Sequence, residues 1–127
     1  MKLRIRGNSV RLRLARSEVE RFKKEGLIGE IVEFEPTSPV FRYELRTTDE
    51  SASIAASFDD NCLTISVPIS KAKIWMGSQE VGIEAAHPIG DGKFLNILIE
   101  KDFACLTPRE SEDESDAFTN PLAHSVV

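Results

Sequence analysis

The strict alternation of apolar and charged residues near the start of the chain constrains its fold more than any other feature. In residues 2–6, Leu3 and Ile5 alternate with lysine and arginine, and residues 10–14 continue the alternation. Successive side chains of a β-strand point to opposite faces of the sheet, so each stretch predicts a strand with one apolar and one basic face. The turn-forming residues 7–9 lie between the two stretches and predict a hairpin.

The rest of the chain predicts two short helices and further strands. Ser17 and Glu20 have the spacing of a capping box, which predicts a helix start, and Gly26 can end that helix. Ser70 opens a second helix that ends near Gly77. Periodicity and turn residues place the remaining strands at residues 28–35, 40–47, 53–58, 63–67, 81–86 and 93–101.

The second half of the chain repeats the order of the first half. When the halves are overlaid so that Ser17 falls on Ser70, no gap is needed, and glycine and aromatic positions also keep register. We interpret the match as two ββαββ repeats, about 2–50 and 54–104, with chance agreement of apolar positions as the alternative. The predicted fold is α+β: a mostly antiparallel sheet or an eight-stranded barrel with two short helices. Closure into a barrel would remove the exposed sheet edges.

Composition predicts one domain and a distinct C-terminal end. The domain is expected to span residues 1–106 and to be followed by an acidic, flexible tail at 107–127. The net charge of −5 favours solubility and argues against bulk affinity for nucleic acid. No stretch has the ~20 apolar residues of a membrane helix, and the start does not resemble a secretory leader, so the cytoplasm is the expected location.

Arginines on the predicted strand faces are the best candidates for a binding site. They could hold a phosphate or carboxylate, because a guanidinium group offers two parallel donors to either anion. The alternative is a solvated sheet face on which the arginines pair with glutamates of neighbouring strands. The candidate anion-binding residues are Arg4, Arg6, Arg11, Arg13, Arg42 and Arg46.

Two weaker hypotheses concern a metal ion and a reactive thiol. Glu33 and Glu35 would share one side of a predicted strand, and with Glu44 they could hold a divalent cation. Cys105 lies among charged residues that could favour its thiolate form, although a free cysteine is more often a small buried hydrophobe. No cofactor is otherwise predicted, and the chain has no GxGxxG, P-loop, HExxH or GxSxG motif.

Three segments together resemble a known family. They are residues 2–14 (KLRIRGNSVRLRL), the helix start at 17–19 (SEV) and residues 99–106 (IEKDFACL). Over nearly its whole length the chain looks like a family of short uncharacterised bacterial proteins, a resemblance that implies no activity and no catalytic residue. A weaker, architectural resemblance is to the triphosphate tunnel (CYTH) fold. Members with that chemistry carry a Glu-x-Glu-x-Lys pattern, and here no lysine follows Glu35 at the required position.

The expected function is that of a non-enzymatic cytoplasmic module that binds a protein partner or a small anionic ligand through the arginine-rich strand face. The alternative is an enzyme acting on a phosphate ester or polyphosphate inside a charged barrel. In that case the arginines would hold phosphate and the three glutamates a metal ion. Neither nucleic acid nor a membrane is an expected partner. The direction in which the charged face points, inward or toward solvent, separates the two functions.

Overall fold

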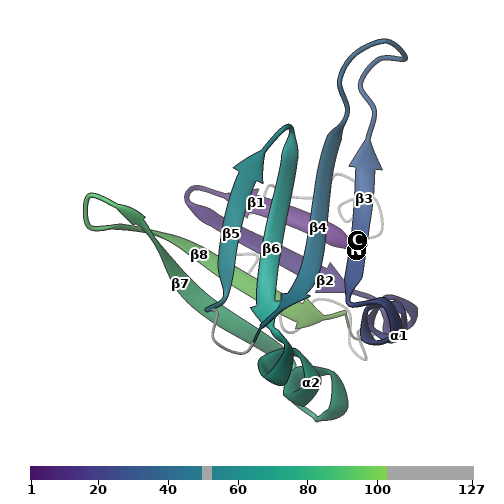
Figure 1. Cartoon of the computed structure of the whole chain (residues 1–127), viewed down its shortest axis with the longest axis vertical. Helices are drawn as coiled ribbons and strands as arrows, with labels where there is room; N and C mark the ends of the chain where they lie inside the picture. Colours follow the sequence, from purple (N-terminus) through teal and green to yellow (C-terminus); the bar gives the residue numbers. More distant parts are fainter. Residues whose placement is uncertain (50–52, 103–127) are drawn as a thin grey trace, which may run out of the picture.

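The computed structural model describes residues 1–49 and 53–102 (Figure 1). Residues 103–127, which include the predicted tail and Cys105, lie outside the described residues. The described part of the chain contains eight strands and two helices. In chain order they are β1 (Lys2–Arg6), β2 (Ser9–Leu14), α1 (Arg16–Glu25), β3 (Leu27–Val32), β4 (Phe41–Thr48), β5 (Ala55–Asp59), β6 (Cys62–Pro68), α2 (Ile69–Gly77), β7 (Gly82–Gly90) and β8 (Lys93–Lys101).

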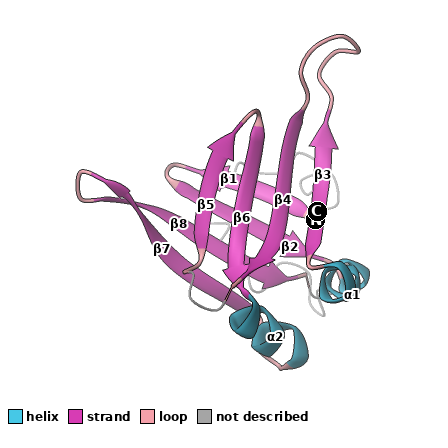
Figure 2. Ribbon diagram, in the orientation of Figure 1, coloured by secondary structure: helices cyan, strands magenta, loops and turns pink. Residues whose placement is uncertain are grey.

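The strands form two four-stranded sheets, and each sheet combines strands from both halves of the chain. Sheet A has the order β1-β2-β8-β7, and sheet B has the order β3-β4-β6-β5. The two central strands of each sheet run parallel, and the outer strands pair with them in antiparallel fashion. Figure 2 shows sheet B in front, with the strands of sheet A crossing obliquely behind it. The α+β class is therefore confirmed.

The barrel that the sequence suggested is wrong, because the eight strands form two separate sheets that do not close. Strand alternation predicts one apolar face for each strand, and that face can be buried inside a barrel or between two stacked sheets. The charged residues consequently do not form one interior wall. The six arginines and Glu44 lie on the outer faces of two sheets, which removes the charged barrel interior that the enzyme alternative required.

The hydrophobic core lies between the two sheets and is closed at one end by the helices. Leu12 and Ile99 of sheet A and Leu45 and Ile65 of sheet B are almost completely buried. Each helix adds one aromatic side chain to this core: Phe22 and Trp75. The indole Nε1 of Trp75 donates a 3.1 Å hydrogen bond to the carbonyl oxygen of Val81, so the buried ring leaves no unpaired donor.

Helix α1 begins earlier than the predicted capping serine. Ala15 is the N-cap residue, and the Glu18 carboxylate accepts a 2.8 Å hydrogen bond from the Ala15 N–H. The prediction that Ser17 and Glu20 form the cap is therefore wrong, although an acid does reach back from the third helical position. The other end is as predicted: Gly26 has a positive φ of 70°, and its N–H donates to the Phe22 carbonyl oxygen.

Strand β3 ends at Val32, three residues before the predicted end. Glu33 and Glu35 consequently lie in the loop that connects β3 to β4 and do not share one side of a strand. The loop also contains Pro36 and Pro39, which have no N–H to donate to a neighbouring strand. Neither helix of the described residues is long and apolar enough to cross a membrane.

Candidate functional site

The outer face of sheet A carries the basic residues of the first hairpin. In β2 the side chains of Val10, Leu12 and Leu14 are buried against sheet B. Strand alternation therefore directs Arg11 and Arg13 to the opposite face. Strand register places the basic residues of β1 beside them, in the pairs Lys2 with Arg13, Arg4 with Arg11, and Arg6 with Ser9.

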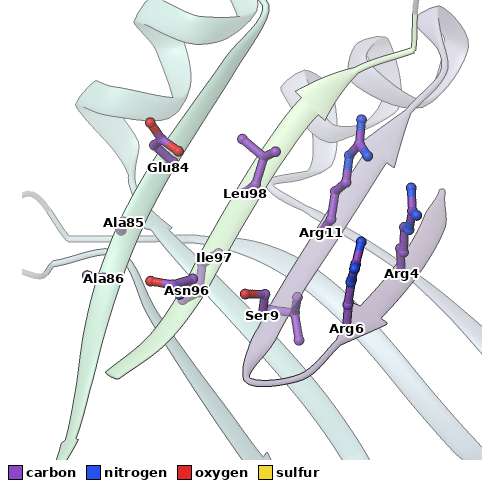
Figure 3. Close-up of a pocket in the computed structure, with 11 residues that line it drawn as sticks. Arg4, Arg6, Ser9, Arg11, Glu84, Ala85, Ala86, Asn96, Ile97 and Leu98 are labelled. Atoms are coloured by element: carbon purple, nitrogen blue, oxygen red, sulfur yellow. The ribbon is translucent and has the colours of Figure 1, made fainter. Parts of the chain in front are cut away.

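This outer face carries a cavity of about 660 Å³ that is open to solvent. Figure 3 shows its two sides: the arginines of β1 and β2 stand on one side, and Glu84 of β7 stands on the other. Asn96 and Leu98 of β8 form the floor between them. We call this the sheet A cavity. Its polar and charged lining residues are Arg4, Arg6, Ser9, Arg11, Glu84 and Asn96.

Two of the arginines are held by a single carboxylate. Glu100 Oε1 accepts hydrogen bonds from Nε of both Arg11 and Arg13, and it also forms ion pairs with their terminal nitrogens. The Glu100 side chain is only 13% exposed, so these pairs are partly shielded from water. Asp102 lies 3.2 Å from Lys2 Nζ and 4.0 Å from Arg13 Nη1. Lys2, Arg11 and Arg13 are therefore already paired with acidic residues of the protein.

Arg4 and Arg6 differ from these residues because they form no ion pair or side-chain hydrogen bond with any residue that the structure describes. Both side chains are exposed, and Arg4 lies directly across the strand pair from Arg11, which also carries a positive charge. Like charges in directly opposed positions of an antiparallel pair are destabilising. Five basic residues and three acidic residues, Glu84, Glu100 and Asp102, share this face, which is positive on a chain whose net charge is −5.

The other predicted anion-binding residues are not part of this cavity. Arg42 and Arg46 lie on β4 of sheet B and are exposed there. The six predicted arginines consequently fall into a group of four on sheet A and a pair on sheet B. The sequence predicted one arginine-rich face, whereas the structure has two separate surfaces.

The predicted metal ligands are also dispersed. Glu33 and Glu35 lie in the β3–β4 loop, where Glu35 accepts a 3.0 Å hydrogen bond from Ser38 Oγ. Glu44 lies on β4 and contacts the Thr64 hydroxyl. Within residues 1–49 and 53–102, no three histidine, cysteine or acidic side chains come together as a metal site would require. The thiol hypothesis at Cys105 falls outside the described residues.

Sequence reasoning missed Glu84, Asn96 and Glu100 as neighbours of the arginines. They are brought there by the parallel pairing of β2 with β8, in which Arg13 is the register partner of Glu100 and Ser9 that of Asn96. Parallel partners are separated by most of the chain, and local alternation does not reveal which strands pair. The available signal was the apolar-rich run of residues 93–101, which predicts the strand without its neighbour.

A second polar cluster lies where the start of the chain meets sheet B. The Tyr43 hydroxyl lies 2.8 Å from both Glu30 Oε2 and the Met1 carbonyl oxygen, and the Met1 α-amino group contacts Glu18 and Glu30. Burial and the hydrogen bond to Glu30 raise the pKa of Tyr43 to about 12. Burial by itself raises the pKa of Glu18, but hydrogen bonds from Met1 and Ala15 outweigh it and lower that pKa.

Fold and site together define the class: an α+β protein of two stacked mixed sheets with an arginine-lined cavity on one outer face. Within that class, the chain belongs to the family described as "Family of unknown function (DUF7009)", whose model matches residues 1–122. This membership confirms the resemblance to an uncharacterised family that the sequence indicated. No curated protein and no solved structure matches the chain.

Proposed function

We propose that this protein is a non-enzymatic module that binds a small anionic ligand in the sheet A cavity. The observation that carries the proposal is the pair of exposed guanidinium groups of Arg4 and Arg6, which have no carboxylate partner among the described residues. They stand beside Arg11, so a bound anion would relieve the repulsion between like charges as well as accept hydrogen bonds.

The shape and lining of the cavity favour a small ligand. A volume of about 660 Å³ is within the usual range for small-molecule sites. The ligand class is a carboxylate or a phosphate, because both match the forked donors of a guanidinium group. A protein partner with acidic side chains could use the same donors, but a flat surface would fill a concave face less completely.

The chemistry of the lining supports binding without turnover. Cations, an amide, a hydroxyl and one carboxylate line the sheet A cavity, and neither histidine nor cysteine is among these described lining residues. Ser9 therefore has no imidazole base beside it of the kind that activates a serine nucleophile. A bacterial cytoplasmic setting remains part of the proposal.

An internal duplication also remains part of the proposal. Both halves have the order ββαββ, and β1 and β5 each contain five residues. The two halves contribute equally to each sheet, since sheet A takes its first hairpin from one half and its second from the other. A cavity on sheet A therefore needs both halves to be complete.

The proposal is tested by calorimetric titration with inorganic phosphate and with acetate. Replacing Arg4 and Arg6 together by alanine should weaken phosphate binding roughly 10- to 30-fold, because each lost contact is an exposed ion pair that contributes about 0.7–1 kcal/mol. In the matched control, Arg42 and Arg46 are both replaced by alanine. This variant loses the same charge from sheet B, and its affinity for phosphate should stay within about twofold of the wild type. Equal losses in the two double variants would show a general charge effect and would reject the site.

A further inference from the structure

The two sides of the sheet A cavity carry opposite charges, and this polarity determines which anions fit best. One row of the strand register runs Arg4, Arg11, Leu98, Glu84 across all four strands. Three of these four residues are charged, and the acid stands alone at the β7 end. Figure 3 shows Glu84 across the β8 floor from the arginine side chains.

Glu84 has no ion-pair or hydrogen-bond partner among the described residues, in contrast to Glu100 of the same sheet. Lys71 lines a neighbouring cavity together with Glu84, but the two side chains form no ion pair. Glu84 is exposed and lies on the rim of the sheet A cavity. Its carboxylate is therefore available to a ligand that also reaches the arginines.

The spacing of the row sets the length of such a ligand. Strands of a sheet lie about 4.8 Å apart, so Arg11 and Glu84, two strands apart, have Cα atoms separated by about 10 Å. Figure 3 shows Leu98 between the two side chains. A ligand that contacts both ends needs an apolar middle of several carbon atoms.

We propose that the sheet A cavity binds a zwitterion, with its carboxylate or phosphate at Arg4, Arg6 and Arg11 and its amine at Glu84. The inference rests on the proposed anion-binding function and adds the positive end of the ligand. The apolar middle of the ligand packs on Leu98, and the amide of Asn96 faces its polar groups. Linear dianions long enough to span the row are disfavoured, because their second negative charge would lie beside the Glu84 carboxylate.

The test compares probes that differ only in the amine. Caproate and ε-aminocaproate have the same carbon chain, and their affinities can be measured by NMR titration of the full-length protein. We expect ε-aminocaproate to bind up to about fivefold more tightly, the effect of one exposed ion pair. Glycine and acetate form a short pair that cannot span the row, and we expect them to bind with equal affinity.

The Glu84→Gln variant assigns the difference to Glu84. It should remove the preference for ε-aminocaproate over caproate, and the variant should fold, since Glu84 is exposed and makes no described contact whose loss would unfold the protein. The Glu20→Gln variant removes an exposed acid on α1 and should retain the preference.

The outcomes separate the inference from the function on which it rests. If phosphate and caproate bind and ε-aminocaproate gains nothing, the zwitterion inference is wrong and the anion site stands. A preference that survives in Glu84→Gln also rejects the inference, because the amine would then contact another group. If neither phosphate nor caproate binds, the anion site itself is wrong, and the inference fails with it.

Discussion

At the scale of single residues, the local structure constrains the backbone of Gly26 and the ionisation of Tyr43. Gly26 adopts a positive φ of 70° between α1 and β3, and an added Cβ atom would lie 3.0 Å from Thr47 Oγ1. Left-handed backbone costs an ordinary L-residue about 1–2 kcal/mol. The residue therefore sets where the first helix ends and how the chain enters sheet B.

We expect Gly26→Ala to lower the free energy of unfolding by about 1–2 kcal/mol because of this backbone strain. The measurement is urea unfolding followed by the fluorescence of Trp75, which is the single tryptophan and is fully buried. Gly77→Ala is the control, because φ is not positive there and nothing lies within 4 Å of an added Cβ atom. A Gly26→Ala variant as stable as the wild type would contradict the helix end described here.

Tyr43 should ionise only at high pH in the folded protein. Its pKa is raised to about 12 by burial and by its hydrogen bond to Glu30. The raised value means that the folded state holds its proton longer than the unfolded state does. Tyr43 therefore contributes stability that is fully present below pH ~10 and is lost as the pH rises through about 12.

The absorbance of tyrosinate measures this titration directly, because Tyr43 is the single tyrosine of the chain. We expect a midpoint well above 10 in the folded protein and a midpoint near 10 in concentrated urea, where burial is lost. The Glu30→Gln variant should lower the folded midpoint, since it removes the negative charge beside the hydroxyl. A folded midpoint near 10 would show that the hydroxyl is open to water.

At the scale of the elements, the positions of most strands could be predicted from the sequence, whereas the pairing between distant strands could not. The residues 2–6 and 10–14 form the predicted hairpin, and the helix end at Gly26 is also as predicted. The parallel pairing of β2 with β8 depends on tertiary packing between segments 87 residues apart, which no local pattern encodes. Arg11 and Arg13 could therefore be named as candidates, but their partner Glu100 could not.

The Glu100→Gln variant tests this pairing. It removes the carboxylate that Arg11 and Arg13 share, and we expect the free energy of unfolding to fall by about 1–2 kcal/mol at neutral pH. Phosphate should then stabilise the variant more than the wild type, because the Glu100 carboxylate no longer competes with the anion for Arg11 and Arg13. Glu20→Gln, a control on α1, should change neither quantity.

The opposite result would be equal stabilisation of Glu100→Gln and the wild type by phosphate. That result would place the anion away from Arg11 and Arg13. Trp75 fluorescence gives the urea midpoint with and without phosphate, because this side chain lies in the core, outside the cavity, and its signal follows unfolding.

At the scale of the whole molecule, two stacked sheets replace the predicted barrel and change what the charges can do. A strand with one apolar face has the same alternating sequence pattern in a barrel and in two stacked sheets. The sequence could therefore predict which residues share a face, but not whether that face is enclosed. The stacking turns the arginines of β1 and β2 outward. Curvature of sheet A then gathers them around an open cavity, while Arg42 and Arg46 face solvent on sheet B.

The most direct test of the central claim is to map the amide chemical shifts of the wild-type protein during titration with inorganic phosphate. The sheet A cavity predicts saturable shifts in β1, β2 and the part of β8 around Asn96, with no comparable shifts in β3 and β4. Shifts centred on Arg42 and Arg46, or shifts that never saturate, would contradict an anion site on sheet A.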